Sequence, residues 1–161
     1  MGDASITTRP ATDDDVADLA GRLRQPDLDA LSAAFPTVAP ADALKLAKDR
    51  GECHVACVNG RPVALFGLST SPHRPARAFP WWAASADAFH SAATIAELLY
   101  LSARLVDGWQ RHYPELVAMN DPQNTIYADW LQFLGFVEMG DAPTASGTPF
   151  TFHYREMPLV R

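Results

Sequence analysis

The chain has 161 residues, of which 48% are hydrophobic, 20% charged and 10% aromatic. A chain of this length and composition buries a sufficient core without a disulfide or a metal, so we expect one domain over residues 1–161. Its net charge of −6 argues against nucleic-acid binding, which depends on clustered basic residues. The sequence has no apolar run long enough to span a bilayer and no signal-peptide pattern at its N-terminus, which predicts a cytoplasmic protein.

The first part of the chain predicts a short strand followed by three helices. Residues 6–9 are mostly β-branched and precede a proline, a pattern typical of an edge strand. Thr12 with Asp15 resembles a capping box, and apolar residues at helical spacing follow over 13–24. Two further short helices are predicted, one lined by Leu28, Leu31 and Phe35 and one running from Pro40 to Gly51.

A β-hairpin is the clearest local prediction. Residues 54–58 and 62–68 are strand-like, and Asn59-Gly60 between them supplies the positive φ angles of a tight turn. Cys53 and Cys57 lie four residues apart in the first strand, which places their Cα atoms about 13 Å apart. Because a disulfide needs a much shorter separation, we expect two buried free thiols.

The second half predicts a strand, a helix and a second strand in succession. Thr94 and Glu97 form another capping-box pattern at the start of a helix over 94–111. This helix connects strands at 81–85 and 116–120, and such a crossover makes them parallel. The remaining elements are a proline-broken loop over 71–80, a helix over 125–134 before Gly135, strands over 136–139 and 150–156, and a loop over 140–149. The order predicts an α/β protein with a mixed, mostly antiparallel sheet flanked by helices.

Trp81 and Trp82 are adjacent in the first strand of this crossover. Successive side chains of a strand point to opposite faces, so one indole fills the core and the other faces a cleft or a partner. The sequence does not decide which of the two lies inside.

The last third carries a family signature. Asn124, a helix and then Leu134-Gly135-Phe136 resemble the Asn, helix, Leu-Gly-Phe pattern of the GNAT superfamily of acyl-CoA-dependent N-acetyltransferases. The predicted order of elements agrees with that superfamily over nearly the whole chain. The resemblance implies the GNAT fold, splayed central strands that accept the pantetheine arm of acetyl-CoA, and an amine acceptor on a small molecule or a protein. In such an enzyme the amine attacks the thioester directly, and catalysis is mostly proximity.

Part of the chain resembles a narrower group within this superfamily. The segments FPWWAAS at 79–85, YPELVAMNDPQN at 113–124 and WLQFLGF at 130–136 are similar to small GNAT-like proteins of short-tailed bacteriophages, including internal virion core proteins. The similarity covers residues 79–154. It implies a phage-encoded protein that acts in the host cytoplasm or in the virion, with a phage or host protein as a partner.

The segment that would hold the pyrophosphate of coenzyme A departs from the superfamily pattern. Members usually carry a glycine-rich turn there, because glycines let backbone N–H groups close around the diphosphate. Residues 85–93 contain neither glycine nor arginine, and Asp87 would repel the diphosphate. Small residues at the helix start could still admit phosphate, with His90 adding charge. On the resemblance, the candidate cofactor-binding residues are Ser85, Ser91, Ala92 and Asn124.

The general acid is also displaced from its usual position. Many members place a Tyr where this chain has Leu131, so that its hydroxyl can protonate the departing CoA thiolate. Tyr127 lies one turn earlier on the same helix and is the candidate catalytic residue. It could act as the acid, stack on the cofactor or block the cofactor site. Asn124 has a simpler interpretation as the helix N-cap, which supports the fold and not the activity.

Other polar residues carry weaker signals. Asp121, His153 and His54 could act as a base through water, although an Asp before Pro is typical of a turn and a strand His is typical of a structural group. The basic loop with Arg74 and Arg77 could contact the 3′-phosphate of coenzyme A or be solvated. No Cys or His cluster has metal-ligand spacing.

Two functions therefore remain open. The first is an active N-acetyltransferase with a degenerate pyrophosphate loop. The second is a GNAT-fold virion, ejection or interaction protein that transfers no acetyl group, with Trp82, Tyr127 or Phe89 filling its cleft. The missing glycines and the missing acid favour the second function, and the frequency of enzymes in the superfamily favours the first.

Overall fold

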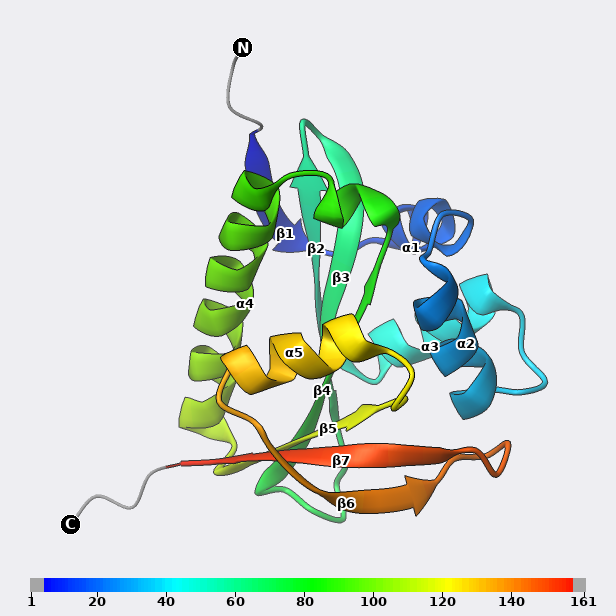
Figure 1. The fold of residues 1–161 in the computed structure, drawn as a ribbon, viewed down its shortest axis with the longest axis vertical. Helices are drawn as coiled ribbons and strands as arrows, with labels where there is room; N and C mark the ends of the chain where they lie inside the picture. The colour runs from blue at the N-terminus through cyan, green and yellow to red at the C-terminus, as the bar shows by residue number, and fades with distance from the viewer. Residues whose placement is uncertain (1–4, 158–161) are drawn as a thin grey trace.

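The computed structural model describes residues 5–157, which form a seven-stranded sheet with helices on both faces (Figure 1). The elements are β1 (Ile6–Pro10), α1 (Asp13–Ala20), α2 (Gln25–Ala34), α3 (Pro40–Asp49), β2 (Gly51–Val58), β3 (Arg61–Thr70), β4 (Arg77–Ala84), the 3₁₀ turn η1 (Ala86–Phe89), α4 (Ala92–His112), β5 (Glu115–Asn120), α5 (Thr125–Phe133), β6 (Val137–Pro143) and β7 (Pro149–Glu156). The strand order is β1-β2-β3-β4-β5-β7-β6, and every neighbouring pair is antiparallel except β4 and β5. The predicted mixed sheet and the parallel pair across the crossover are therefore confirmed.

Two apolar clusters lie on opposite faces of the sheet. Helices α4 and α5 cover one face, and α1, α2 and α3 cover the other (Figure 1). In β4, Trp82 belongs to the cluster under α4 and α5 and is 8% exposed, whereas the half-buried Trp81 packs against the other cluster. Trp82 is thus the core residue of the pair. No helix among residues 5–157 combines the length and the apolar composition that a membrane span requires.

Helix α1 begins as predicted and ends earlier. The Thr12 hydroxyl accepts from the Asp15 backbone N–H, and the Asp15 carboxylate accepts from the Thr12 backbone N–H, which confirms the capping box. The helix stops four residues before its predicted end because Leu23 forms an antiparallel bridge with Ser85. This bridge draws the connection between α1 and α2 to the end of β4.

The β2–β3 hairpin is confirmed. Asn59 has a φ of 50° and Gly60 a φ of 81°, as a two-residue turn of this type requires. Cys53 and Cys57 are free and buried, as predicted. Burial raises the pKa of the Cys53 thiol to about 12, which keeps it protonated and unreactive at neutral pH.

Strand β4 begins at Arg77, inside the segment predicted as a loop over 71–80. The strand tolerates Pro80 because of its position in the ladder. The Ser85 N–H donates to the Val63 carbonyl at 2.9 Å, so the backbone groups of odd-numbered residues in β4 form hydrogen bonds with β3. Pro80 therefore directs its ring nitrogen to the opposite edge, where no hydrogen bond is needed.

Two further predictions at element ends are wrong. Helix α4 is capped by Ser91, whose hydroxyl accepts from the Thr94 N–H at 3.1 Å, and not by the pair of Thr94 and Glu97. Strand β6 is longer than predicted, because a register shift next to Gly140 lets the pairing with β7 continue. Residues 144–148 alone connect the two strands.

Candidate functional site

The parallel strands β4 and β5 pair only near their beginnings. The register contains two pairs, Arg77 with Glu115 and Ala78 with Leu116. Because β4 continues to Ala84, most of its edge toward β5 has no partner strand. This gap between the strands is the place where the family resemblance puts the pantetheine arm of acetyl-CoA.

The start of α2 closes the free edge of β4. Even-numbered residues of β4 direct their backbone nitrogens into the gap, and Pro80 among them has no N–H. The Ala84 N–H donates to Asp27 Oδ2 at 3.2 Å, and the Ala84 carbonyl accepts from the Arg24 backbone N–H at 2.9 Å. Along this stretch only Trp82 offers an N–H to an extended ligand.

Arg24, Asp27 and Asn124 form a buried polar cluster that we call the clamp. The Asp27 carboxylate accepts from the Arg24 guanidinium at 2.9 and 3.0 Å and from Asn124 Nδ2 at 3.1 Å. The side chains of Arg24 and Asp27 are only 9% and 3% exposed. Burial raises the pKa of Asp27, and its hydrogen bonds oppose that shift. Because Asn124 also caps α5 by accepting from the Tyr127 N–H, the clamp ties α2, β4 and α5 together across the gap.

Four aromatic side chains fill the space between β4, α4 and α5, and we call Trp82, Phe89, Tyr127 and Trp130 the aromatic plug. The Trp82 ring stacks on Trp130 with centroids 4.8 Å apart, and its centroid lies 5.3 Å from Tyr127 and 5.8 Å from Phe89. The Arg24 guanidinium covers Phe89 at 4.8 Å. A cavity beneath α4 and α5, lined by Trp82, Tyr127 and Trp130 among other core residues, has a volume of about 20 Å³, room for about one water. The rings of the plug therefore occupy the space between β4 and the two helices.

The predicted cofactor-binding residues lie around this closed gap. Ser85 is buried and donates its hydroxyl to the Val63 carbonyl at 3.3 Å. Ser91 caps α4 and Ala92 is the first residue of that helix, and both are exposed. Asn124 belongs to the clamp and is the predicted N-cap. Cofactor binding by these residues stays a prediction.

Asp87 does not present an isolated negative charge. Its carboxylate lies 3.3 Å from the Arg22 guanidinium and 3.6 Å from that of Arg61. These two arginines come from the ends of α1 and β3 and are far from Asp87 in sequence. They offset the repulsion of a diphosphate that the sequence alone predicts.

Tyr127 lies inside the aromatic plug, where it is 8% exposed. Burial, together with the nearby Asp27 carboxylate, raises the pKa of its hydroxyl above the ordinary value. The hydroxyl therefore stays protonated at neutral pH. Tyr127 and Trp82 also line a large cavity on the other side of the gap, so the plug forms part of the wall of that cavity.

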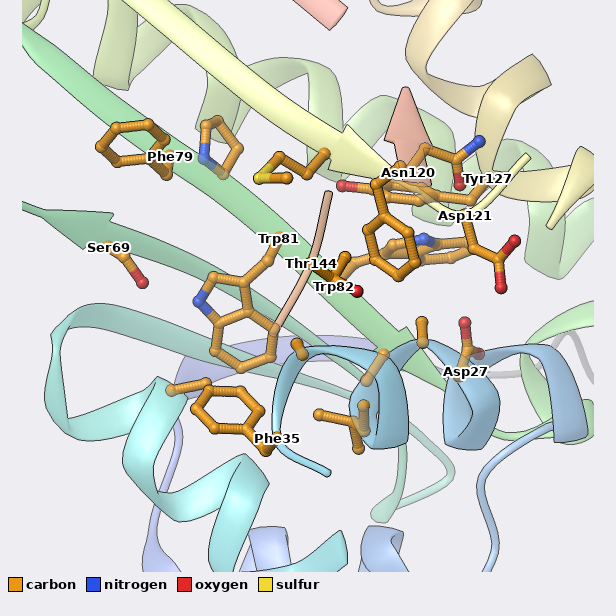
Figure 2. A pocket seen from close by; sticks show the side chains of 18 of the residues that line it. Asp27, Phe35, Ser69, Phe79, Trp81, Trp82, Asn120, Asp121, Tyr127 and Thr144 are labelled. Atoms are coloured by element: carbon orange, nitrogen blue, oxygen red, sulfur yellow. The ribbon is translucent and has the colours of Figure 1, made fainter. Parts of the chain in front are cut away.

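This cavity has a volume of about 690 Å³, a size typical of small-molecule sites. It lies between α2, the end of α3, β4, β5 and the loop joining β6 to β7, and that loop docks on α2 through the Ser146 N–H and the Ala33 carbonyl at 3.2 Å. Trp81 reaches into the cavity over Gly67, where a Cβ atom would come within 2.1 Å of the indole. Figure 2 shows Trp81 and Phe35 at one side and Asp121 at the other. The walls are mainly apolar and include Leu31, Phe35, Phe79, Trp81, Val117 and Phe150.

The other candidate residues mostly make structural contacts. His54 contacts Glu52 at 2.9 Å, and Arg77 donates to the side chains of β5 and β7. His153 is buried, and burial lowers its pKa. Asp121 is a turn residue, as predicted, and it also lines the cavity. Within residues 5–157 no group of three or more His, Cys, Asp or Glu could hold a metal.

Sequence analysis did not identify Arg24 and Asp27 as site residues. An Arg just before a helix and an Asp in its first turn are ordinary features of a solvent-exposed helix start. Only the packing of α2 against β4 and α5 buries this pair. The sequence therefore contained a charge pattern but no sign of its burial.

Solved structures of similar fold are acetyltransferases. The ribosomal-protein-S5-alanine acetyltransferase from Vibrio fischeri matches with a TM-score of 0.66, 12% identity, and coverage of 96% of this chain and 97% of that one. An N-acetyltransferase from Staphylococcus aureus Mu50 matches with a TM-score of 0.68, 16% identity, and coverage of 94% and 98%. AAC(6')-Ib in complex with ribostamycin and coenzyme A matches with a TM-score of 0.66, 19% identity, and coverage of 94% and 93%. No family model and no curated protein matches the sequence.

At these identities the similarity concerns the fold and not the activity. It extends over nearly the whole of each chain, including the crossover between β4 and β5 and the helix after Asn124. The chain therefore has the GNAT fold, as its sequence signature implies.

Proposed function

We propose that this protein is a GNAT-fold binding protein that transfers no acetyl group and takes its ligand in the cavity beside α2. One observation carries the proposal: the clamp and the aromatic plug occupy the groove along β4 where a pantetheine arm would lie. Fold alone does not imply catalysis, and a cavity of about 690 Å³ lies on the side of the gap that faces α2.

The groove is closed by well-packed interactions. Trp82 contacts four other aromatic rings, and the Asp27 carboxylate accepts hydrogen bonds from three different residues. Opening the groove would leave the Arg24 and Asp27 charges unpaired or exposed and would separate stacked rings. The closed groove is therefore a stable part of the folded protein.

The second candidate is acetyl transfer to an amine. It is favoured by the fold, since AAC(6')-Ib shares it and was solved with coenzyme A, and by Tyr127, whose protonated hydroxyl lines the cavity. The narrower expectation of a bacteriophage virion protein rests on the similarity over residues 79–154 alone. The three solved structures described above are acetyltransferases, and none of them is a virion protein.

Titration of acetyl-CoA by calorimetry tests the proposal. We expect no binding to the wild-type protein up to about 1 mM. Tyr127→Ala and Phe89→Ala each remove part of the plug, and we expect either to improve affinity for acetyl-CoA. Phe89 is only half-buried, so its variant remains folded if Tyr127→Ala does not. Tyr100→Ala is the matched control, because this aromatic residue of α4 is 60% exposed and outside the plug.

Micromolar binding of acetyl-CoA to the wild-type protein would overturn the proposal. The second candidate makes a further prediction, since Tyr127→Phe should then lower acetyl transfer by ~10²-fold with little change in acetyl-CoA affinity. Release of free coenzyme A from acetyl-CoA in the presence of a panel of amines measures this transfer. No transfer in the wild-type protein agrees with the proposed binding function.

A further inference from the structure

The two ends of the 690 Å³ cavity differ in charge. At one end lies Arg50, whose guanidinium is 5.3 Å from the Phe35 ring centroid. Within the described residues Arg50 takes part in no ion pair, whereas Arg22 and Arg24, the arginines beside α1 and α2, do. The Ser69 hydroxyl lines the same end and is another possible hydrogen-bond donor. This end therefore offers positive charge and a donor without an acidic partner.

The opposite end is acidic and polar. Asp121, Asn120 and Tyr127 line it together with Asp27. Figure 2 shows Asp27 and Asp121 at the side of the cavity away from Ser69 and Phe35. The Asp27 charge is compensated by Arg24, whereas among residues 5–157 the Asp121 carboxylate accepts only from the Gln123 backbone N–H. A ligand anion is thus repelled at this end and attracted at the other.

The region between the two ends is apolar. Phe79 and Trp81 project from the same face of β4 and stay half-buried, and Met119 on β5 is 37% exposed. The Trp81 indole packs directly on the backbone of β3 because Gly67 has no side chain at that point. Partly exposed aromatic rings in a concave site gain free energy when an apolar molecule covers them.

We propose that this cavity binds an elongated, mostly apolar molecule with a carboxylate at one end. The carboxylate pairs with the Arg50 guanidinium and accepts from the Ser69 hydroxyl. The apolar body lies along Phe35, Phe79 and Trp81 and ends toward Tyr127. This inference rests on the proposed binding function and names the chemical class of its ligand.

Three probes of equal chain length test it by calorimetry, each below its solubility or micelle-forming limit: decanoate, decan-1-ol and decylamine. We expect decanoate to bind at least about tenfold tighter than decan-1-ol, because a charge-assisted hydrogen bond to the guanidinium contributes about that factor. Arg50→Gln should remove this difference and leave decan-1-ol binding unchanged. Arg74→Gln is the matched control, since Arg74 lies on the exposed loop before β4 and outside the cavity.

Trp81→Ala provides a second variant, which should weaken the binding of decanoate and decan-1-ol alike. Decanoate binding that survives Arg50→Gln undiminished would overturn the inference. The absence of binding by any of the three probes would overturn it as well. Preference for decylamine, lost in Asp121→Asn, would identify the cavity as an amine site instead. Each of these outcomes is independent of acetyl-CoA binding, so this inference can fail while the proposed function holds.

Discussion

The two sides of the gap between β4 and β5 are built in opposite ways. Beside the aromatic plug, under α4 and α5, the cavity has a volume of about 20 Å³, whereas on the side of α2 a cavity of about 690 Å³ remains. Trp82 and Trp81, neighbours in one strand, pack into the apolar clusters on the closed and the open side respectively. Because β4 and β5 diverge after two paired residues, the gap between them opens toward both faces of the sheet. Side-chain volume and charge pairing then decide which side can receive a ligand.

Replacing each of these two tryptophans by alanine should give the largest difference in the free energy of unfolding. We expect Trp82→Ala to lower the free energy of unfolding by about 5 kcal/mol, because its buried ring packs against several aromatic rings. Trp81→Ala should cost about 1–2 kcal/mol, since Trp81 is only half-buried. Urea denaturation measures both. Equal losses would contradict the distinction between a filled and an open side.

Substitution in the clamp should give the next largest loss in the free energy of unfolding. Asp27→Asn removes the carboxylate that compensates the buried Arg24 guanidinium, and we expect a loss of about 3 kcal/mol in the free energy of unfolding. Asp18→Asn, in an ion pair with Arg22 where the Asp18 side chain is 47% exposed, is the control and should cost less than about 1 kcal/mol. The double variant Arg24→Met, Asp27→Leu should recover much of the loss. No recovery would show that the clamp acts through its hydrogen bonds rather than its charges.

The packing of Trp81 on Gly67 can be tested by adding a methyl group to the glycine. Gly67→Ala would place a Cβ 2.1 Å from the Trp81 indole, and we expect a loss of about 2 kcal/mol together with a changed tryptophan fluorescence. Gly108→Ala in α4 meets nothing within 4 Å and should stabilise the protein by about 0.5–1 kcal/mol. Opposite signs for the two variants are the expected result in thermal unfolding. A neutral Gly67→Ala would mean that the indole moves freely in the cavity.

The smallest expected effect on stability comes from Asp15, which lies away from the gap between β4 and β5. The Arg9 guanidinium and the Thr12 backbone N–H hold the pKa of Asp15 at about 2, below its ordinary value of 3.8. A lowered pKa in the folded state stabilises the protein above about pH 4, and this contribution disappears as the pH falls toward 2. Because Arg9 is half-exposed, we expect about 1 kcal/mol. Urea denaturation across this range should show a weaker pH dependence for Asp15→Asn than for the wild-type protein.

Local sequence determined much of the fold. The turn at Asn59-Gly60, the capping box at Thr12 and the helix stop at Gly135 depend on backbone preferences of the residues themselves, and all three are present in the structure. The parallel pairing of β4 and β5 followed from the helical crossover that connects them. These features could be predicted because each depends on a few neighbouring residues or on the order of elements.

The boundaries of β4 and the composition of the site were decided by tertiary structure. Pro80 is compatible with a strand only because β5 diverges and leaves that edge of β4 free. Trp81 and Trp82 alternate in any strand, but only the packed helices decide which indole is buried. Arg24 and Asp27 lie 100 and 97 positions from Asn124, and no local pattern relates them. The sequence by itself therefore specified the elements and their order, whereas the closed groove and the open cavity arise from distant side chains that meet only when α2 and α5 pack beside β4.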